Sequence, residues 1–201
     1  MSDDSTPQKY FEAAYDAVKG GCSFTYLSNR ELAWPLKIGK RLQDVWPQDM
    51  TFSMNPERPK DKALTDYIPN LEGLLVASPK LIAFLRGQSL PDLEFLPITI
   101  LDHKGRVAAK DYAVVSCCRV VDCVDQQASD FRWDGLQEPS MVMKKLAVKA
   151  DSLGDDDRLI RPKFVPGRVL YRADLREALK AQQFSGLGFS RELFGDFTVY
   201  W

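Results

Sequence analysis

His103 is the residue with the most catalytic potential, because it is the only histidine in the chain. A nucleophilic triad or an imidazole base would have to use it, with the neighbouring Asp102 as an orienting carboxylate. Both residues lie in the segment Asp102-His103-Lys104-Gly105, whose residue types favour a turn. We therefore interpret them as turn residues, and the sequence predicts no catalytic residue.

Cysteines and clustered aspartates are the next candidates, as metal ligands. Cys117 and Cys118 are adjacent, and no Cys-x-x-Cys motif occurs among the four cysteines. Zinc sites use spaced ligand pairs, and a calcium-binding EF-hand loop alternates its ligands around a glycine, unlike the run Asp155-Asp156-Asp157. The sequence predicts buried, reduced thiols, a solvated acidic loop, and no metal or cofactor.

Phosphate-binding loops are not recognisable in the sequence. Gly186-Leu187-Gly188 lacks the third glycine of a dinucleotide-binding motif. The 28 aspartates and glutamates leave a catalytic carboxylate pair open, because residues distant in sequence can meet in space. An enzyme or small-ligand-binding domain with a carboxylate-lined pocket is therefore the alternative function.

Binding to another protein is the function that these residue types favour. Trp34, Trp46 and Trp133 lie in polar, loop-like stretches, and tryptophan is a frequent anchor in protein interfaces. The acidic run Asp155, Asp156 and Asp157 could complement a basic partner. We take these six residues as candidate partner contacts, with packing in or beside the core as the alternative for each tryptophan.

Composition and charge restrict the partner and the compartment. The 201 residues carry a net charge of −1, without the basic surplus that nucleic-acid binding usually requires. No apolar run approaches the roughly 20 residues that span a bilayer, and residues 1–7 are polar and acidic, unlike a signal peptide. We expect a cytoplasmic, single-domain protein of residues 1–201, with residues 1–7 flexible, that binds neither nucleic acid nor membrane.

The elements that position these residues follow from hydrophobic patterning. Residues 93–101 and 110–124 predict two long strands of a hairpin that bends near Gly105. Both faces of the second strand are apolar, which places it inside a sheet. Shorter patterns predict strands at 24–27, 50–54, 141–148, 169–172 and 186–189, helices at 78–86 and 174–183, and a polar excursion at 126–140. Because strands and helices do not alternate, we predict an α+β fold with a mainly antiparallel sheet and a few packed helices.

Four segments in a fixed order resemble a known family. Residues 66–81 contain an acidic residue, a short apolar stretch and Ser-Pro-Lys-Leu at a helix start, and residues 93–98 read Leu-Glu-Phe-Leu-Pro-Ile. Residues 112–125 form the long valine-rich segment, and residues 170–189 contain Leu-Tyr-Arg, a short helix pattern and Phe-Ser-Gly-Leu-Gly-Phe. From Leu36 to Phe189 this order resembles the eleventh immunity family of bacterial polymorphic toxin systems, formerly a domain of unknown function.

The resemblance implies an α+β protein that is encoded beside a secreted toxin and neutralises that toxin in the cytoplasm without catalysis. Some family members are encoded near nuclease-like toxins, so a nuclease is one candidate partner. Ser116 stands where the family often has asparagine. The N-terminal third matches poorly, and we expect partner specificity to vary there. The oligomeric state stays open, as does a role as a subunit of a larger assembly.

Overall fold

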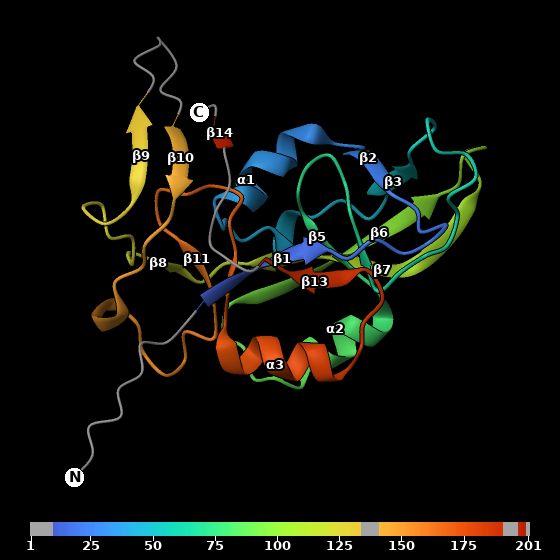
Figure 1. The fold of residues 1–201 in the computed structure, drawn as a ribbon. Helices are drawn as coiled ribbons and strands as arrows, with labels where there is room; N and C mark the ends of the chain where they lie inside the picture. Colours follow the sequence, from blue (N-terminus) through green and yellow to red (C-terminus); the bar gives the residue numbers. More distant parts are fainter. Residues whose placement is uncertain (1–9, 134–140, 191–196, 200–201) are drawn as a thin grey trace.

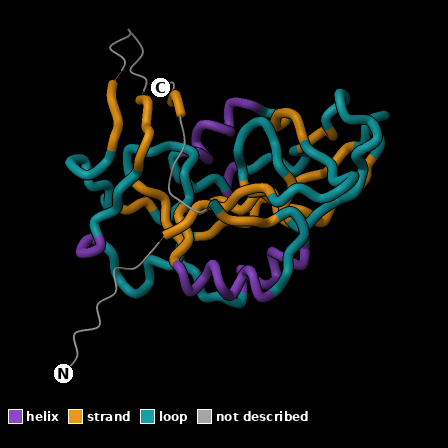
Figure 2. Tube along the Cα trace, viewed as in Figure 1, coloured by secondary structure: helices purple, strands orange, loops and turns teal. Residues whose placement is uncertain are grey.

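The computed structural model describes residues 10–133, 141–190 and 197–199, and the statements below concern these residues. Strands dominate the fold and form three sheets of six, five and three strands (Figure 1). Short helices lie on either side of the strands (Figure 2). The architecture is α+β with mostly antiparallel pairing, which confirms the predicted fold class.

The six-stranded sheet contains the predicted hairpin. Its strand order is β2 (Phe24–Leu27), β3 (Thr51–Met54), β6 (Leu93–Leu101), β7 (Val107–Cys117), β5 (Leu75–Ala77) and β4 (Tyr67–Ile68). Of these neighbours, β3 and β6 pair parallel, and the others pair antiparallel. The β6–β7 turn contains Gly105 at φ +73°, a left-handed conformation that glycine adopts readily. The hairpin and the interior position of β7 are thus confirmed.

The five-stranded sheet joins distant parts of the chain. Its order is β13 (Leu187–Phe189), β1 (Tyr10–Tyr15), β12 (Leu170–Arg172), β11 (Leu159–Pro162) and β8 (Val120–Val121). β8 and β11 pair parallel, and the other neighbours pair antiparallel. The three-stranded sheet contains β9 (Asp130–Trp133), β10 (Met141–Lys145) and β14 (Phe197–Val199). Each sheet therefore depends on pairings between segments that are not consecutive in sequence.

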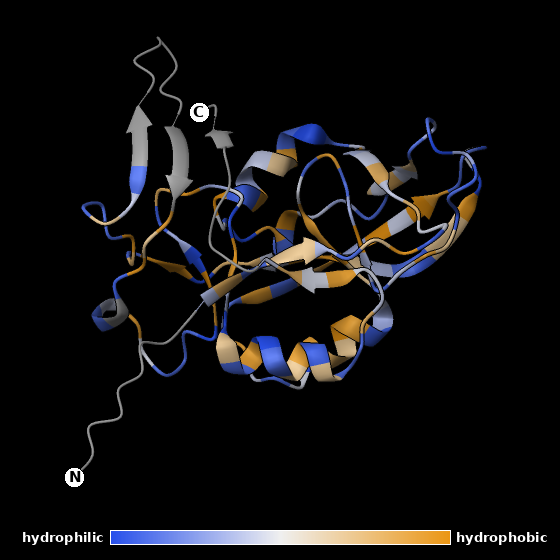
Figure 3. Ribbon diagram, viewed as in Figure 1, coloured by the Kyte–Doolittle hydropathy of each residue, from blue (hydrophilic) through white to orange (hydrophobic). Residues whose placement is uncertain are grey.

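The described residues contain three α-helices: α1 (Ala33–Lys37), α2 (Pro79–Arg86) and α3 (Ala173–Ala181). Short 3-10 helices occupy Arg30–Leu32, Gln43–Val45 and Ala150–Ser152. The Ser78 hydroxyl accepts a hydrogen bond from the Leu81 N–H at 3.2 Å and caps α2, as its sequence predicts. Apolar and polar residues alternate along α3 (Figure 3), and its two buried leucines face the strands.

The two faces of β7 belong to two different hydrophobic cores. Val114 packs into the core with Phe24, Phe52 and other side chains of the six-stranded sheet. Val115 and Cys117 pack into the second core with leucines of α2 and α3. Successive strand residues point to opposite faces, so the apolar run at 113–117 serves both cores. A third cluster surrounds Cys123 and Ile160 beside β11.

Several sequence predictions were wrong in detail. The second hairpin strand ends at Cys117, not at 124, because the Cys118 N–H donates to the Asp92 carbonyl oxygen and the chain restarts as β8. The N-terminal third contains β1 and α1 besides the expected short strands. Proline is tolerated in α1 because Pro35 lies in the first turn, where its missing N–H is not needed. The expected excursion at 126–140 contains β9, and the predicted flexible tail at 1–7 lies outside the described residues.

Candidate functional site

The acidic loop before β11 contains two exposed aspartates and one buried aspartate. Asp155 and Asp156 are exposed, whereas Asp157 is only 4% exposed. The Asp157 carboxylate accepts hydrogen bonds from Arg119 Nε and from the Gly154 N–H, both at 2.9 Å. The prediction of a solvated loop is therefore wrong for Asp157, because these donors compensate its buried charge.

Further contacts hold this loop against the five-stranded sheet. The Tyr10 hydroxyl donates to the Asp157 carbonyl oxygen at 2.6 Å, and Arg172 Nη1 donates to the Asp155 carbonyl oxygen at 2.8 Å. Sequence reasoning missed Arg119, because no local signal links it to an aspartate 38 positions away. The loop thus presents Asp155 and Asp156 on a fixed backbone.

The three candidate tryptophans occupy different environments. Trp34 lies in α1 and is exposed, so its assignment to a loop was wrong. Trp46 is partly buried against the first core, and its Nε1 donates to the Pro97 carbonyl oxygen at 2.8 Å. Trp133 lies in β9, and its side chain is outside what the structure describes. Trp34 is therefore the tryptophan that is best placed to contact a partner.

The alternative function requires a pocket lined by carboxylates. A cavity of about 500 Å³ lies between α3 and β13, and Asp16 is the one acidic residue in its lining, beside Arg176 and Lys180. A smaller cavity of about 80 Å³ contains Glu12 and Arg168. Neither cavity brings two carboxylates of the described residues together, so neither has the geometry of a paired-carboxylate site.

Buried glutamates elsewhere have separate partners. Glu12 forms an ion pair with Arg168 at 2.7 Å, and burial raises the pKa of the Glu12 carboxyl in spite of that arginine. Glu94 accepts a hydrogen bond from the Leu42 N–H at 2.8 Å, and Glu72 lies 3.4 Å from Lys37 Nζ. These contacts tie neighbouring segments together, which is a structural use of the carboxylates.

His103 and Asp102 occupy the hairpin turn, as predicted. Asp102 accepts hydrogen bonds from the backbone and side chain of Arg106, which lower the pKa of its carboxyl to about 2. His103 Nε2 lies 2.9 Å from the Arg58 carbonyl oxygen. The carboxylate of Asp102 therefore organises the turn and does not contact the imidazole in the manner of a triad.

Neither a metal site nor a membrane-spanning helix is present in the part of the chain that the structure describes. They contain no group of three or more histidine, cysteine, aspartate or glutamate side chains arranged to hold a metal ion. All four cysteines are free thiols. Cys22, Cys117 and Cys123 are buried as predicted, whereas Cys118 is only partly buried. No helix in the described segments has the length and apolar character needed to cross a membrane.

Comparison with known proteins places most of the chain in one family. No curated protein matches this sequence. Residues 6–192, in contrast, match the Immunity protein family (Imm11). The match begins well before Leu36, where the resemblance seen in the sequence starts, so it includes β1, β2 and α1. Since the match covers nearly the whole length, this chain belongs to the Immunity protein family (Imm11).

Proposed function

We propose that this protein binds a cognate bacterial toxin in the cytoplasm and neutralises it by covering its active surface. The observation that carries the proposal is the family match over residues 6–192. An inhibitor that works by binding needs a shaped surface and no catalytic residues of its own. Trp34 in α1 and Asp155 and Asp156 in the turn before β11 are exposed, so they remain our candidate contacts.

The two exposed aspartates suit a basic partner. Complementary charge accelerates association and helps to select the correct partner. A nuclease toxin carries positive charge where it binds phosphates, so a nuclease is the partner that this loop would favour. Asp157 takes no part in the contact, because its carboxylate already accepts hydrogen bonds from Arg119 and Gly154.

The test is a rescue assay with the product of the gene immediately upstream. Co-expression of this protein should restore the growth of cells that produce that toxin, and the two proteins should co-purify. A harmless neighbour, or a toxic one that never associates with this protein, would contradict the proposal. Ligand screening against the cavity between α3 and β13 would then test the alternative function.

Two variants refine the assay. Reversing both charges with Asp155→Lys and Asp156→Lys should weaken binding and reduce the dependence of the association rate on salt. Asp44→Lys, at an exposed residue of the 3-10 helix Gln43–Val45, provides the control for a charge change elsewhere. Unchanged affinity in the double variant would remove the acidic loop from the interface without affecting the immunity function.

A further inference from the structure

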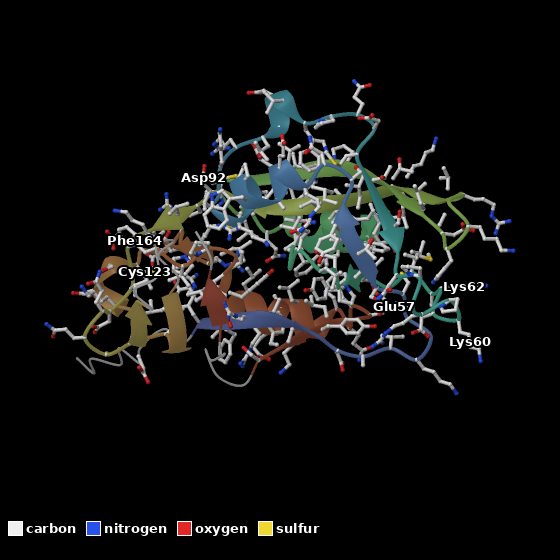
Figure 4. The ribbon with its side chains drawn as sticks, turned by 90° about the horizontal axis from the view of Figure 1, so that it is seen from above. Glu57, Lys60, Lys62, Asp92, Cys123 and Phe164 are labelled. Atoms are coloured by element: carbon white, nitrogen blue, oxygen red, sulfur yellow. The ribbon has the colours of Figure 1, made fainter. Side chains whose placement is uncertain are left out.

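A groove with apolar walls and cationic residues lies where α1, β8 and β11 meet. Its volume is about 210 Å³. We call it the α1–β11 groove and define it by six of its lining residues: Lys37, Ile38, Val120, Arg161, Lys163 and Phe164. Figure 4 shows Phe164 at the end of the molecule opposite Lys60 and Lys62. The groove residues come from three segments that are distant in sequence.

The apolar walls of the groove are exposed to solvent. Ile38 is 40% exposed, Val120 44% and Phe164 50%. Three large, exposed apolar side chains line one groove, and contiguous exposed apolar surface is a common feature of interaction sites. Lys163 Nζ lies 4.7 Å from the centroid of the Phe164 ring, so a cation accompanies the most exposed of the three.

Phe164 has a backbone conformation that is unfavourable for its residue type. Its φ is +67°, in the left-handed region that bulky residues rarely adopt. Residues held in such conformations cluster at binding and active sites. Because the ring remains half-exposed, packing inside this protein gives little compensation for the strain, and a bound partner would give more.

The positive charge of the groove is not balanced within its lining. Arg161 is only 6% exposed, and its guanidinium donates to the carbonyl oxygens of Lys37 at 2.7 Å and of Cys117 and Arg168 at 3.2 Å. Among the described residues, no carboxylate forms an ion pair with Arg161. Lys37 pairs with Glu72, and Lys163 pairs with the exposed Asp122, but neither acid lines the groove. In the part of the chain that the structure describes, the lining of the groove therefore contains three cationic residues and no acidic one.

The groove is held open by close backbone packing. Gly39 has φ +77°, and a Cβ at this position would lie 2.7 Å from Val120 Cγ2 and 3.2 Å from Arg161 Cδ. The Gly167 N–H also donates to the Lys37 carbonyl oxygen at 2.9 Å. These contacts fix the end of α1 against β8 and β11. A partner would meet a preformed surface and lose less conformational entropy on binding.

We propose that the α1–β11 groove is a second contact surface for the toxin, and that it takes an acidic segment with an apolar side chain beside its carboxylate. The identity of the partner rests on the proposed function. The apolar side chain would pack between Ile38, Val120 and Phe164. The carboxylate would face Lys163 and Arg161. The apolar side chains that line the groove lower the local dielectric constant and so strengthen the attraction between these charges.

Phe164→Gly is the most direct test, because glycine suits φ +67° and the variant should fold at least as well as the parent. We expect its affinity for the toxin to fall at least about tenfold, as for an aromatic anchor. Gln183→Gly, at φ +53° outside the groove, is the matched backbone control and should bind as the parent does.

Lys163→Glu tests the charge separately. It should slow association, because it places a negative charge beside the acidic segment. If the parent protein binds the toxin while Phe164→Gly and Lys163→Glu bind equally well, the groove proposal is overturned and the immunity function stands. If the parent binds no toxin, the proposed function itself fails.

A second copy of this chain is the other possible occupant of the groove, and a measurement of molecular mass in solution tests it. The parent and Phe164→Gly should have the same oligomeric state when no toxin is present. Self-association that Phe164→Gly abolishes would instead make the groove a contact between copies of this chain, and would overturn the assignment to the toxin.

Discussion

Buried charges near the two ends of β11 have different hydrogen-bond partners. At its start, Asp157 receives hydrogen bonds from a cationic side chain, Arg119, and from the Gly154 N–H. Within and after the strand, Arg161 contacts carbonyl oxygens alone among the described residues, and Phe164 is exposed. The first end pairs its buried charge with an opposite charge, whereas the second has a buried arginine without an ion pair among the described residues and an exposed aromatic ring.

Among the variants that test this difference, Asp157→Ala should change the free energy of unfolding most. The change removes a buried acceptor of two hydrogen bonds and leaves the Gly154 N–H and Arg119 without it. We expect the free energy of unfolding to fall by about 3 kcal/mol, measured by urea denaturation. Asp156→Ala, at the exposed neighbour, should change it by less than about 0.5 kcal/mol. Equal effects would show that the loop is not divided as described.

Gly39→Ala tests the close packing that holds the groove open. The added Cβ would crowd Val120 and would also occupy a left-handed backbone, at a total cost of about 2 kcal/mol. Gly105→Ala, at φ +73° with open space around it, should cost about 1 kcal/mol from the backbone alone. Urea denaturation gives the loss of unfolding free energy in each variant, and the difference between the two losses is the cost of the crowding. Identical losses would mean that the groove wall is not tightly packed.

Phe164→Gly, unlike Gly39→Ala, should not destabilise the protein. Relief of the left-handed conformation should raise the free energy of unfolding, or leave it unchanged within about 1 kcal/mol, since glycine also gains entropy in the unfolded chain. The measurement is thermal or urea unfolding without toxin. A loss above about 1 kcal/mol would identify the ring as a structural support, and the contrast between the two ends of β11 would disappear.

The smallest expected effect is on the pH dependence of stability. It involves Asp174, whose partners Arg158 and Arg172 lie beside the start of β11 and in β12. Hydrogen bonds from Arg172 and Arg158 lower the pKa of Asp174 in the folded protein. This stabilisation is therefore complete above the unfolded pKa of about 3.9 and is lost as the pH falls through the folded value. Asp174 is half-exposed, so its contribution should stay below about 1 kcal/mol.

Asp174→Asn gives the measurement for this effect. Urea unfolding from about pH 6 down to about pH 2 should show a shallower acid decline in the variant than in the parent protein. At the upper end of that range the variant should be slightly less stable, because the ionised carboxylate and its two arginine contacts are missing. Parallel curves would show that Asp174 contributes nothing to acid sensitivity.

Local signals explain which elements could be predicted from the sequence. The β6–β7 hairpin has a glycine turn and two apolar runs, and α2 has Ser78 and Pro79 at its start. β1 has no comparable signal, because its stability comes from pairing with residues 170–172 and 187–189. The family resemblance likewise rested on the central and C-terminal motifs and missed the match that extends to residue 6.

The candidate site was less predictable, because side chains of one type have different neighbours. Asp155, Asp156 and Asp157 are identical in sequence terms, and the carboxylate contact with Arg119 separates the last from the others. The α1–β11 groove combines segments around positions 38, 120 and 164, which no motif connects. An aromatic residue beside a lysine, between Pro162 and Pro166, was the one local sign that the loop after β11 presents a side chain.

The position of β1 has a consequence for the order of folding. Tyr10–Tyr15 lies between β12 and β13, so the first described strand must wait until residue 189 has left the ribosome before it can pair on both sides. The β6–β7 hairpin, in contrast, brings together neighbours and can form early. During synthesis the five-stranded sheet should therefore close after the β6–β7 hairpin, once both strands that flank β1 are available.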